Sequence, residues 1–383
     1  MQVPLFDNTR QFQALRESLL TSVERVLVSG KYILGPDVEL FEREAAEYLG
    51  VKHAIGVASG TDALWLALRA LGIGPNDRVL TTPFTFFATA SAILTTGAKP
   101  ALADIDPESF NLDVAQVRRV LEGDCETNKR LGIRPDSIKA IIPVHLYGQS
   151  ADLDELMALA KEYGLFVVED VAQAFGADYK GRKLGTIGDL GCFSFFPTKT
   201  LGGFGDGGLV VTDNDKLAAA VRLLRSHGSK PKYYHHLSGS NSRLDTIQAT
   251  MLRVKLQHVD EWIRARQSHG AGYDVALRNL VGIHSPYRAP GRTHTYHQYT
   301  IRVSLNKRDE LQTFLKERGV GSEVYYPLPM HLQPVLLPEG YRPGDFPNAE
   351  QACSEVLSLP IFPEMRSDER DYVTASIRDF PAD

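Results

Sequence analysis

Apolar and polar positions change their spacing regularly between residues 53 and 170. Short, almost continuous apolar runs, such as AIIPV at 140–144 and LFVV at 165–168, are typical of strands buried on both faces of a sheet. Between these runs, apolar residues recur at helical spacing. The alternation predicts a mainly parallel sheet covered by helices on both sides, with ligands at the carboxyl ends of the strands. The predicted strands are 53–57, 78–82, 100–104, 138–144 and 165–169, and the predicted helices are 62–71, 85–95, 112–121 and 152–163.

Helical spacing dominates the rest of the chain. One long pattern, 245–276, predicts a single helix that bridges to a second domain. We therefore expect a large domain of residues 1–245, and a second part, 246–383, made of the bridging helix and a small α/β domain. The other predicted elements are helices at 8–28, 35–49, 214–226, 308–318, 348–357 and 367–377, strands at 296–303 and 322–326, and a loop at 229–243.

The stretch GCFSFFPTKTLGGFGDGGLVV, residues 191–211, places Lys199 between two predicted strands, 192–196 and 209–211. Glycines let the backbone approach a neighbour closely, and they reduce stability, so a loop this rich in glycine indicates a site. Residues 203–208 also satisfy the pattern GxGxxG. A dinucleotide-binding loop needs a helix after this pattern, whereas a strand follows here, so we reject that interpretation.

Asp170 is the last residue of the buried-strand pattern LFVVED, so its side chain is expected at the ligand edge of the sheet. Alone, Asp170 is as well explained as a helix N-cap, and a single lysine in a loop is usually a solvated charge. Together, Asp170 and Lys199 match what pyridoxal phosphate requires. The lysine forms a Schiff base, and the carboxylate keeps the pyridine nitrogen protonated so that the ring accepts electrons.

The phosphate of such a cofactor needs an anion site. Gly60 and Thr61 follow the first strand and begin a helix, where free N–H groups and the helix dipole favour an anion. Ser194, near the end of the strand before Lys199, is a further candidate for the phosphate. For Gly60 and Thr61, the alternative is an ordinary Ser/Thr helix cap with no ligand.

Two further residues are candidates for contacts with the cofactor ring. Phe84 follows a strand end and is a candidate to stack on the pyridine, although a plain core aromatic is the alternative. We assign Phe86 and Phe87 to the core. Gln173, one short turn past Asp170, is a candidate to hydrogen-bond the ring oxygen.

Composition narrows the class of protein. A net charge of −5 argues against a nucleic-acid surface, and no apolar run approaches the roughly 18 residues that a membrane span needs. The N-terminus has neither a basic n-region nor an apolar h-region. The three cysteines are widely spaced, which fits a reducing cytoplasm. His294 and His297 form no HExxH, and surface or hydrogen-bonded histidine is the favoured interpretation, so no metal is expected.

The chain resembles the sugar aminotransferases of the DegT/DnrJ/EryC1/StrS family along essentially its whole length. The resemblance implies a pyridoxal-phosphate enzyme of fold type I, an α/β protein with a mostly parallel seven-stranded sheet between helices and a small C-terminal α/β domain. The motifs that carry it, in order, are SGKYILGPDVELFE, ASGTDAL, TTPFTFFATA, PVHLYGQSADLDEL, VVEDVAQAFGADYKG, GDLGCFSFFPTKTLGGFGDGG, GSNSRLDTIQA and YYPLPMHLQP.

The family implies a role for each candidate. Asn241, in the GSNSR loop, is similar to the residue that reaches the neighbouring subunit's phosphate, so a homodimer with shared active sites is expected. Tyr326 and His331 are candidates for sugar or diphosphate contact, with packing at the domain interface as the alternative. The remaining implied roles are Lys199 as the Schiff-base lysine, Asp170 at the pyridine nitrogen, Gln173 near the phenolic oxygen, Gly60, Thr61 and Ser194 at the phosphate, and Phe84 on the ring.

The implied reaction is transamination of a keto nucleotide sugar, linked to dTDP or UDP, with L-glutamate as amino donor and 2-oxoglutarate as product. The segments PVHLYG, YYHH and YYPLPMHLQP most resemble members that aminate C3 of a 3-keto sugar. Two alternatives remain. One is a non-catalytic regulatory member of the family, and the other is a pyridoxal-phosphate sugar dehydratase, against which the presence of Lys199 argues.

Overall fold

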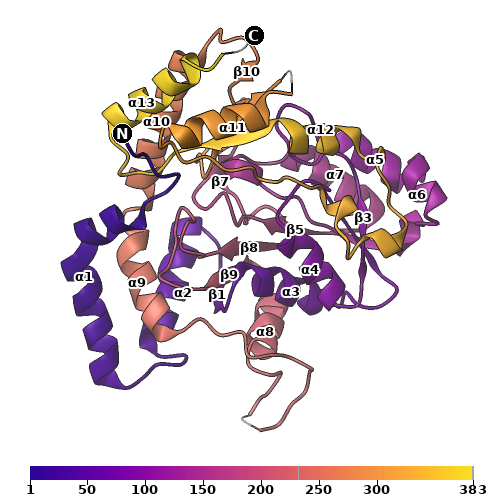
Figure 1. Ribbon diagram of the computed structural model, residues 1–383. Coiled ribbons are helices and arrows are strands. Elements are labelled where there is room, and N and C mark those ends of the chain that lie inside the picture. The colour runs from indigo at the N-terminus through magenta and orange to yellow at the C-terminus, as the bar shows by residue number, and fades with distance from the viewer. Residues whose placement is uncertain (232, 305, 382–383) are drawn as a thin grey trace.

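The computed structural model describes residues 1–231, 233–304 and 306–381. At its centre lies a seven-stranded sheet, which can be followed in Figure 1. Only β9 runs against the others, so the sheet is mostly parallel, and the predicted fold class is confirmed. The strands lie in the order β1 (His53–Val57), β9 (Gly208–Thr212), β8 (Leu190–Ser194), β5 (Phe166–Asp170), β4 (Ile138–Ile141), β2 (Arg78–Thr81) and β3 (Lys99–Leu102).

Helices cover both faces of this sheet, as the continuous apolar strands require. On β9, Val210 points to one face, where it joins a core cluster with Leu64 of α3. Its neighbours Leu209 and Val211 point to the other face, against Phe41 of α2. The helices of this part are α1 (Asn8–Ser29), α2 (Pro36–Leu49), α3 (Gly60–Ala70), α4 (Ala88–Thr95), α5 (Val114–Leu121), α6 (Glu126–Arg130), α7 (Leu153–Tyr163) and α8 (Asp215–Leu224).

The C-terminal part has a separate core around an antiparallel three-stranded sheet. Val3 joins that core and pairs with Val320, so the N-terminal end lies against the C-terminal part (Figure 1). The domain boundary expected at 245/246 stays a prediction. The elements here are α10 (Val259–Leu277), β10 (Ile283–His284), β11 (Tyr299–Val303), α11 (Arg308–Glu317), α12 (Pro347–Glu355), β12 (Val356–Leu359) and α13 (Ser367–Arg378).

Three sequence-based assignments are corrected by the structure. The long pattern at 245–276 is not one helix, because α9 (Thr246–Leu256) ends in a tight turn in which the His258 N–H donates to the Lys255 carbonyl, and α10 follows. The predicted helix 348–357 ends at Glu355, where the apolar run that follows becomes β12. The predicted strand 322–326 is reduced to a single bridge between Glu323 and Ser358.

Among the described residues, no helix is both long enough and apolar enough to cross a membrane. The same part of the chain holds no group of three or more metal-ligating side chains.

Candidate active site

Residues far apart in the sequence meet at the carboxyl edge of the central sheet. Asp170 ends β5, Ser194 ends β8, and Lys199 lies in the turn that follows β8. Gly60 begins α3, directly after β1. These residues line a cavity of about 630 Å³. Of the ten residues predicted from the sequence, the cavity is lined by Gly60, Thr61, Asp170, Gln173, Ser194, Lys199 and Tyr326.

Asp170 is held firmly in this cavity and is only 5% exposed. One carboxylate oxygen accepts from the Thr89 hydroxyl at 3.0 Å, and the other accepts from the Ala172 N–H at 3.2 Å. Burial raises the pKa of Asp170 above its ordinary value, and the charge of Lys199 acts in the opposite direction. A buried carboxylate in this position is stabilised by a positively charged partner, such as a protonated ring nitrogen.

Lys199 carries an unusually acidic ammonium group. Burial lowers its pKa from 10.5 to about 8, against the opposing effect of Asp170. Its backbone N–H donates to the Phe196 carbonyl at 2.8 Å, which fixes the turn after β8. A lysine with this pKa releases its proton easily near neutral pH, as a Schiff-base lysine must.

The start of α3 and the end of β8 pack closely enough to form an anion site. A Cβ added at Gly60 would come within 2.6 Å of the Ser194 Cβ, so only glycine fits there. Ser59 caps the helix, because its hydroxyl accepts from the Asp62 N–H at 3.1 Å. Thr61 and Ser194 line the cavity beside this helix N-terminus, and each has a hydroxyl group. Free N–H groups, a helix dipole and two hydroxyls suit a phosphate, so the residues present fit the phosphate of pyridoxal phosphate.

Gln173 links the cavity floor to the C-terminal part of the chain. Its Oε1 accepts from the Tyr147 N–H at 2.7 Å, and its Nε2 donates to the Tyr326 hydroxyl at 3.0 Å. Burial raises the pKa of Tyr326 far above its ordinary value, so this hydroxyl stays protonated. Both Gln173 and Tyr326 therefore present fixed, neutral polar groups to the cavity.

The aromatic prediction is corrected by the structure. Phe84 is fully buried and is absent from the cavity lining, because the chain turns inward after β2 and packs its ring against Phe110, Tyr147 and Tyr326. Phe86, which the sequence analysis assigned to the core, is 59% exposed and lines the cavity. Phe86 therefore takes the place expected for Phe84 in the cavity lining, together with Phe196, Tyr325 and Tyr326.

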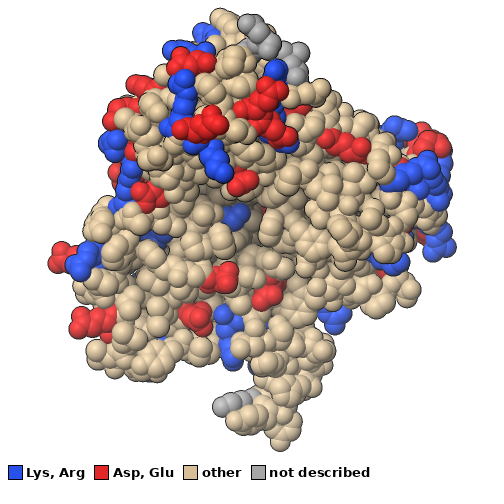
Figure 2. Space-filling model, viewed as in Figure 1, with Lys and Arg blue, Asp and Glu red and all other residues tan. Residues whose placement is uncertain are grey.

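Two other predicted residues lie away from the cavity. His331 is fully buried, where its Nε2 bonds to Glu350 at 3.0 Å and its ring packs on Phe346, and this favours packing over contact with the sugar or diphosphate. Asn241 is exposed and pairs with Ser226 in the loop after α8. In Figure 1 and Figure 2 this loop projects below the body of the molecule. The expected role of Asn241 in a neighbouring subunit stays a prediction.

The structure adds cavity residues that sequence reasoning missed. His297 and Gln298 come from the approach to β11, and Thr89 comes from α4. The only signal for His297 was the pair His294-x-x-His297, which the sequence analysis considered for a metal and set aside. Thr89 and Gln298 carried no signal, since nothing in their spacing marks them.

Comparison with known proteins covers nearly the whole chain. A model of the DegT/DnrJ/EryC1/StrS aminotransferase family matches residues 13–378. A pleiotropic regulatory protein of Geobacillus stearothermophilus is 48% identical, over 99% of each chain. The dTDP-3-amino-3,4,6-trideoxy-alpha-D-glucose transaminase of Streptomyces venezuelae is 42% identical, over 99% of this chain and 96% of its own. The UDP-N-acetyl-3-dehydro-alpha-D-glucosamine 3-aminotransferase of Acidithiobacillus ferrooxidans is also 42% identical, over 98% of this chain and 97% of its own.

Solved structures agree with the fold. A crystal structure of S. venezuelae DesV in complex with a ketimine intermediate superposes with a TM-score of 0.92 at 41% identity, over 99% of this chain and 98% of that chain. A structure of NtdA from Bacillus subtilis with the bound cofactor PMP has a TM-score of 0.89 at 30% identity, over 98% of this chain and 84% of that chain.

Proposed function

The chain belongs to the DegT/DnrJ/EryC1/StrS aminotransferase family, and from this membership we propose that it transfers an amino group from L-glutamate to the keto carbon of a nucleotide-linked sugar. The products are an amino sugar nucleotide and 2-oxoglutarate. The observation that carries the proposal is the pairing of Lys199 and Asp170 in one cavity, beside an anion site at the start of α3.

We further propose that the amino group is delivered to C3 of a 3-keto sugar. Two relatives that are 42% identical over nearly the whole chain are named for a 3-amino sugar and for a 3-dehydro sugar. One is named for a dTDP-linked sugar and the other for a UDP-linked sugar, so the proposal includes both nucleotides.

Pyridoxal 5′-phosphate, when bound, supplies an aldehyde carbon that carries the amino group and a ring that accepts electrons from the donor's Cα. Lys199 holds the cofactor through its Nζ between turnovers. Asp170 keeps the ring nitrogen protonated, while Gly60, Thr61 and Ser194 hold the phosphate. We propose that Phe86, an exposed aromatic residue of the cavity lining, covers the ring, and that Gln173 donates to the ring oxygen.

Lys199 also moves the protons of the reaction. As a neutral amine, its Nζ takes the proton that the Cα of glutamate loses in the first half-reaction. In the second half-reaction, the same Nζ gives a proton to the sugar carbon that receives nitrogen. The lowered pKa of about 8 supports this role, because it keeps a useful fraction of the amine neutral near physiological pH.

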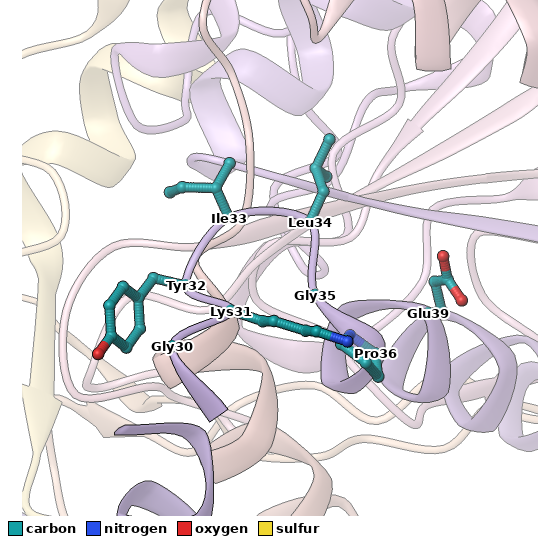
Figure 3. A pocket seen from close by; sticks show the side chains of 8 residues that line it. All are labelled: Gly30, Lys31, Tyr32, Ile33, Leu34, Gly35, Pro36 and Glu39. Atoms are coloured by element: carbon teal, nitrogen blue, oxygen red, sulfur yellow. The ribbon is translucent and has the colours of Figure 1, made fainter. Parts of the chain in front are cut away.

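We propose that the protein works as a homodimer with shared active sites. Exposed apolar side chains gather in the segment Tyr32–Leu34, between α1 and α2, beside a surface hollow of about 480 Å³ (Figure 3). The described part of the projecting loop after α8, which carries Asn241, is a second candidate contact. Exposed apolar surface of this kind supports contact with another chain. The three free cysteines suit a reducing compartment, and we propose the cytoplasm.

One observation favours a second candidate, a regulatory protein without turnover, because the relative at 48% identity is named a pleiotropic regulatory protein. The presence of Lys199 and Asp170, with the complete anion site, supports the enzyme instead. The retained Lys199 likewise supports transamination over dehydration of the sugar.

The test is a panel of keto nucleotide sugars incubated with glutamate, with detection of the aminated product by mass. We expect a 3-keto sugar nucleotide to gain nitrogen, and Lys199→Ala to lose both turnover and the visible absorbance of the bound cofactor. Lys216→Ala, on the exposed surface of α8, is the matched control and should behave as wild type. A wild-type protein that binds the cofactor but never changes its absorbance with glutamate would support the regulatory alternative.

A further inference from the structure

The cavity wall formed by His297 and Gln298 includes two buried polar atoms that have no hydrogen-bond partner among the described residues. His297 is 8% exposed and lines the cavity, and its Nδ1 has no hydrogen-bond partner among the described residues. The buried Oε1 of Gln298, the next residue, is also without a partner in that part of the chain. Buried polar atoms are nearly always hydrogen-bonded, so two neighbouring exceptions in one cavity indicate a ligand.

This wall is held rigidly from both sides. On one side, Arg266 of α10 is 1% exposed and donates to the carbonyls of Tyr296 at 3.0 Å and His297 at 3.4 Å. On the other side, the Thr295 N–H donates to the Gly148 carbonyl at 2.9 Å. A Cβ added at Gly148 would come within 3.1 Å of the backbone N of His297, which shows how closely the two segments pack. The backbone that carries His297 and Gln298 therefore has a fixed position before any ligand arrives, which favours binding.

The charge of this wall selects the kind of group that it can bind. Burial and the nearby charge of Lys199 hold the pKa of His297 well below its ordinary value, so the ring is neutral. Its two nitrogens then offer one donor and one acceptor, and the Gln298 amide offers both as well. Lys199 is the only lysine or arginine among the described residues that line the cavity. A carboxylate only accepts hydrogen bonds, so it would leave the Oε1 of Gln298 without a partner, whereas a hydroxyl group both donates and accepts and matches both residues.

Resting on the proposed function, we propose that His297 and Gln298 form the subsite that binds hydroxyl groups of the keto sugar ring, and that they take no part in binding glutamate. The two residues are specificity determinants for the second half-reaction. Their neutral donors and acceptors orient the sugar while Lys199 and Asp170 remain free for the cofactor.

The two half-reactions separate this proposal from its alternatives. The variants are His297→Leu and Gln298→Leu, which keep similar volume and remove the polar atoms, and His297→Asn, which restores a neutral donor and acceptor. Each cofactor-loaded variant is mixed first with glutamate and then with the 3-keto sugar nucleotide, and the cofactor absorbance is followed through each single turnover. His284→Ala, on the exposed strand β10, is the matched control.

We expect each leucine variant to raise the apparent dissociation constant for the keto sugar nucleotide about tenfold, as loss of one hydrogen bond implies, while the glutamate half-reaction stays at its wild-type rate. His297→Asn should recover part of the loss. The unchanged glutamate step also shows that the variant is folded and loaded.

Two results would overturn the proposal. One is a leucine variant whose glutamate half-reaction weakens as much as its sugar half-reaction, and the other is a variant with wild-type affinity for the sugar. Failure of the proposed function is a different result, because wild-type protein would then aminate no keto nucleotide sugar at all.

Discussion

Lys255 supports the glycine loop from behind the cavity, and its replacement by methionine is the most informative perturbation of the fold. The side chain is 2% exposed, and its ammonium donates to the Gly202 carbonyl. It lies 5.0 Å from the ring centre of Phe204 and 5.7 Å from that of Trp262. The variant Lys255→Met keeps most of the volume and removes only the charge and its donor.

At neutral pH, two opposing effects make the expected change in stability small. Burial lowers the pKa of Lys255 from 10.5 to about 8. At about 1.4 kcal/mol per pH unit, removal of the buried charge saves a cost of about 3.5 kcal/mol. Against this, the variant loses a charged hydrogen bond worth about 1.5–3 kcal/mol and cation–π contacts worth about 1–2 kcal/mol. We expect the free energy of unfolding to stay within about 2 kcal/mol of the wild type.

The pH dependence gives a sharper magnitude. Because the folded-state pKa of Lys255 lies below the unfolded-state value, the unfolded chain holds a proton between pH 8 and 10.5 that the folded protein has lost. Wild-type stability therefore rises with pH across this window, and the variant lacks that contribution. Wild type should gain about 2 kcal/mol over Lys255→Met between pH 7 and pH 10.

The assay is urea unfolding of the cofactor-free proteins at pH 7 and pH 10, together with turnover of the loaded enzymes at pH 7. Loosening of Gly202, three residues after Lys199, should lower turnover about tenfold, since small errors in placing a reacting group are costly. Lys216→Met, on the exposed surface of α8, is the control for loss of a lysine. The assignment of Lys255 as a buried, charged support would be refuted by two results together. These are a stability difference between wild type and Lys255→Met that does not change with pH, and a wild-type rate of turnover in the variant.

Three further predictions follow from the site. Phe86→Ala should weaken cofactor binding in an absorbance titration, with little change in Tm. Phe84→Ala, which empties a core position, should cost about 3–5 kcal/mol in urea unfolding without a direct loss of cofactor contacts. Equal effects of the two variants on both properties would contradict the assignment of Phe84 to the core and Phe86 to the cavity. Glu169→Gln should cost about 3 kcal/mol in urea unfolding, because this fully buried carboxylate accepts from three backbone N–H groups of the turn before β8 and bonds to His145 at 3.0 Å. The rate at which cofactor-free protein recaptures pyridoxal phosphate should rise with pH through a midpoint near 8, since the neutral amine of Lys199 is the nucleophile; a flat stopped-flow profile between pH 6.5 and 9, roughly spanning that pKa, would count against it.

The sheet was predictable because its physical signal is local. A strand buried on both faces must be apolar at every position, and a helix that covers it must be apolar at helical spacing, so the strands β1 to β5 appear directly in the sequence. The failures have a common cause. Residues 356–359 continue the apolar pattern of α12, and only pairing with β11, more than fifty residues earlier, makes them a strand. The turn at His258 likewise depends on what each half of the helix packs against.

The meeting of Lys199 and Asp170 in one cavity was also predictable. Lys199 and Asp170 follow strand ends and carry chemistry that few other arrangements use, so the pair identifies the cofactor. The sequence could not show which aromatic side chain of TTPFTFFATA faces the cavity. Phe84 and Phe86 have the same chemistry and the same parity, and only the inward turn after β2 decides which ring is buried and which faces the cavity.

The break between α9 and α10, which the sequence pattern did not predict, lies between two buried cations. Lys255 and Arg266 are both nearly fully buried, and they lie about three helical turns apart along this pair of helices. Lys255 donates to the carbonyl of Gly202, in the loop that carries Lys199, and Arg266 donates to the carbonyl of His297, in the wall opposite. Burial of these two charges is energetically costly, because it lowers the pKa of both Lys255 and Arg266. Because backbone carbonyls from two separate segments receive these charges, α9 and α10 support both the loop that carries Lys199 and the segment that carries His297.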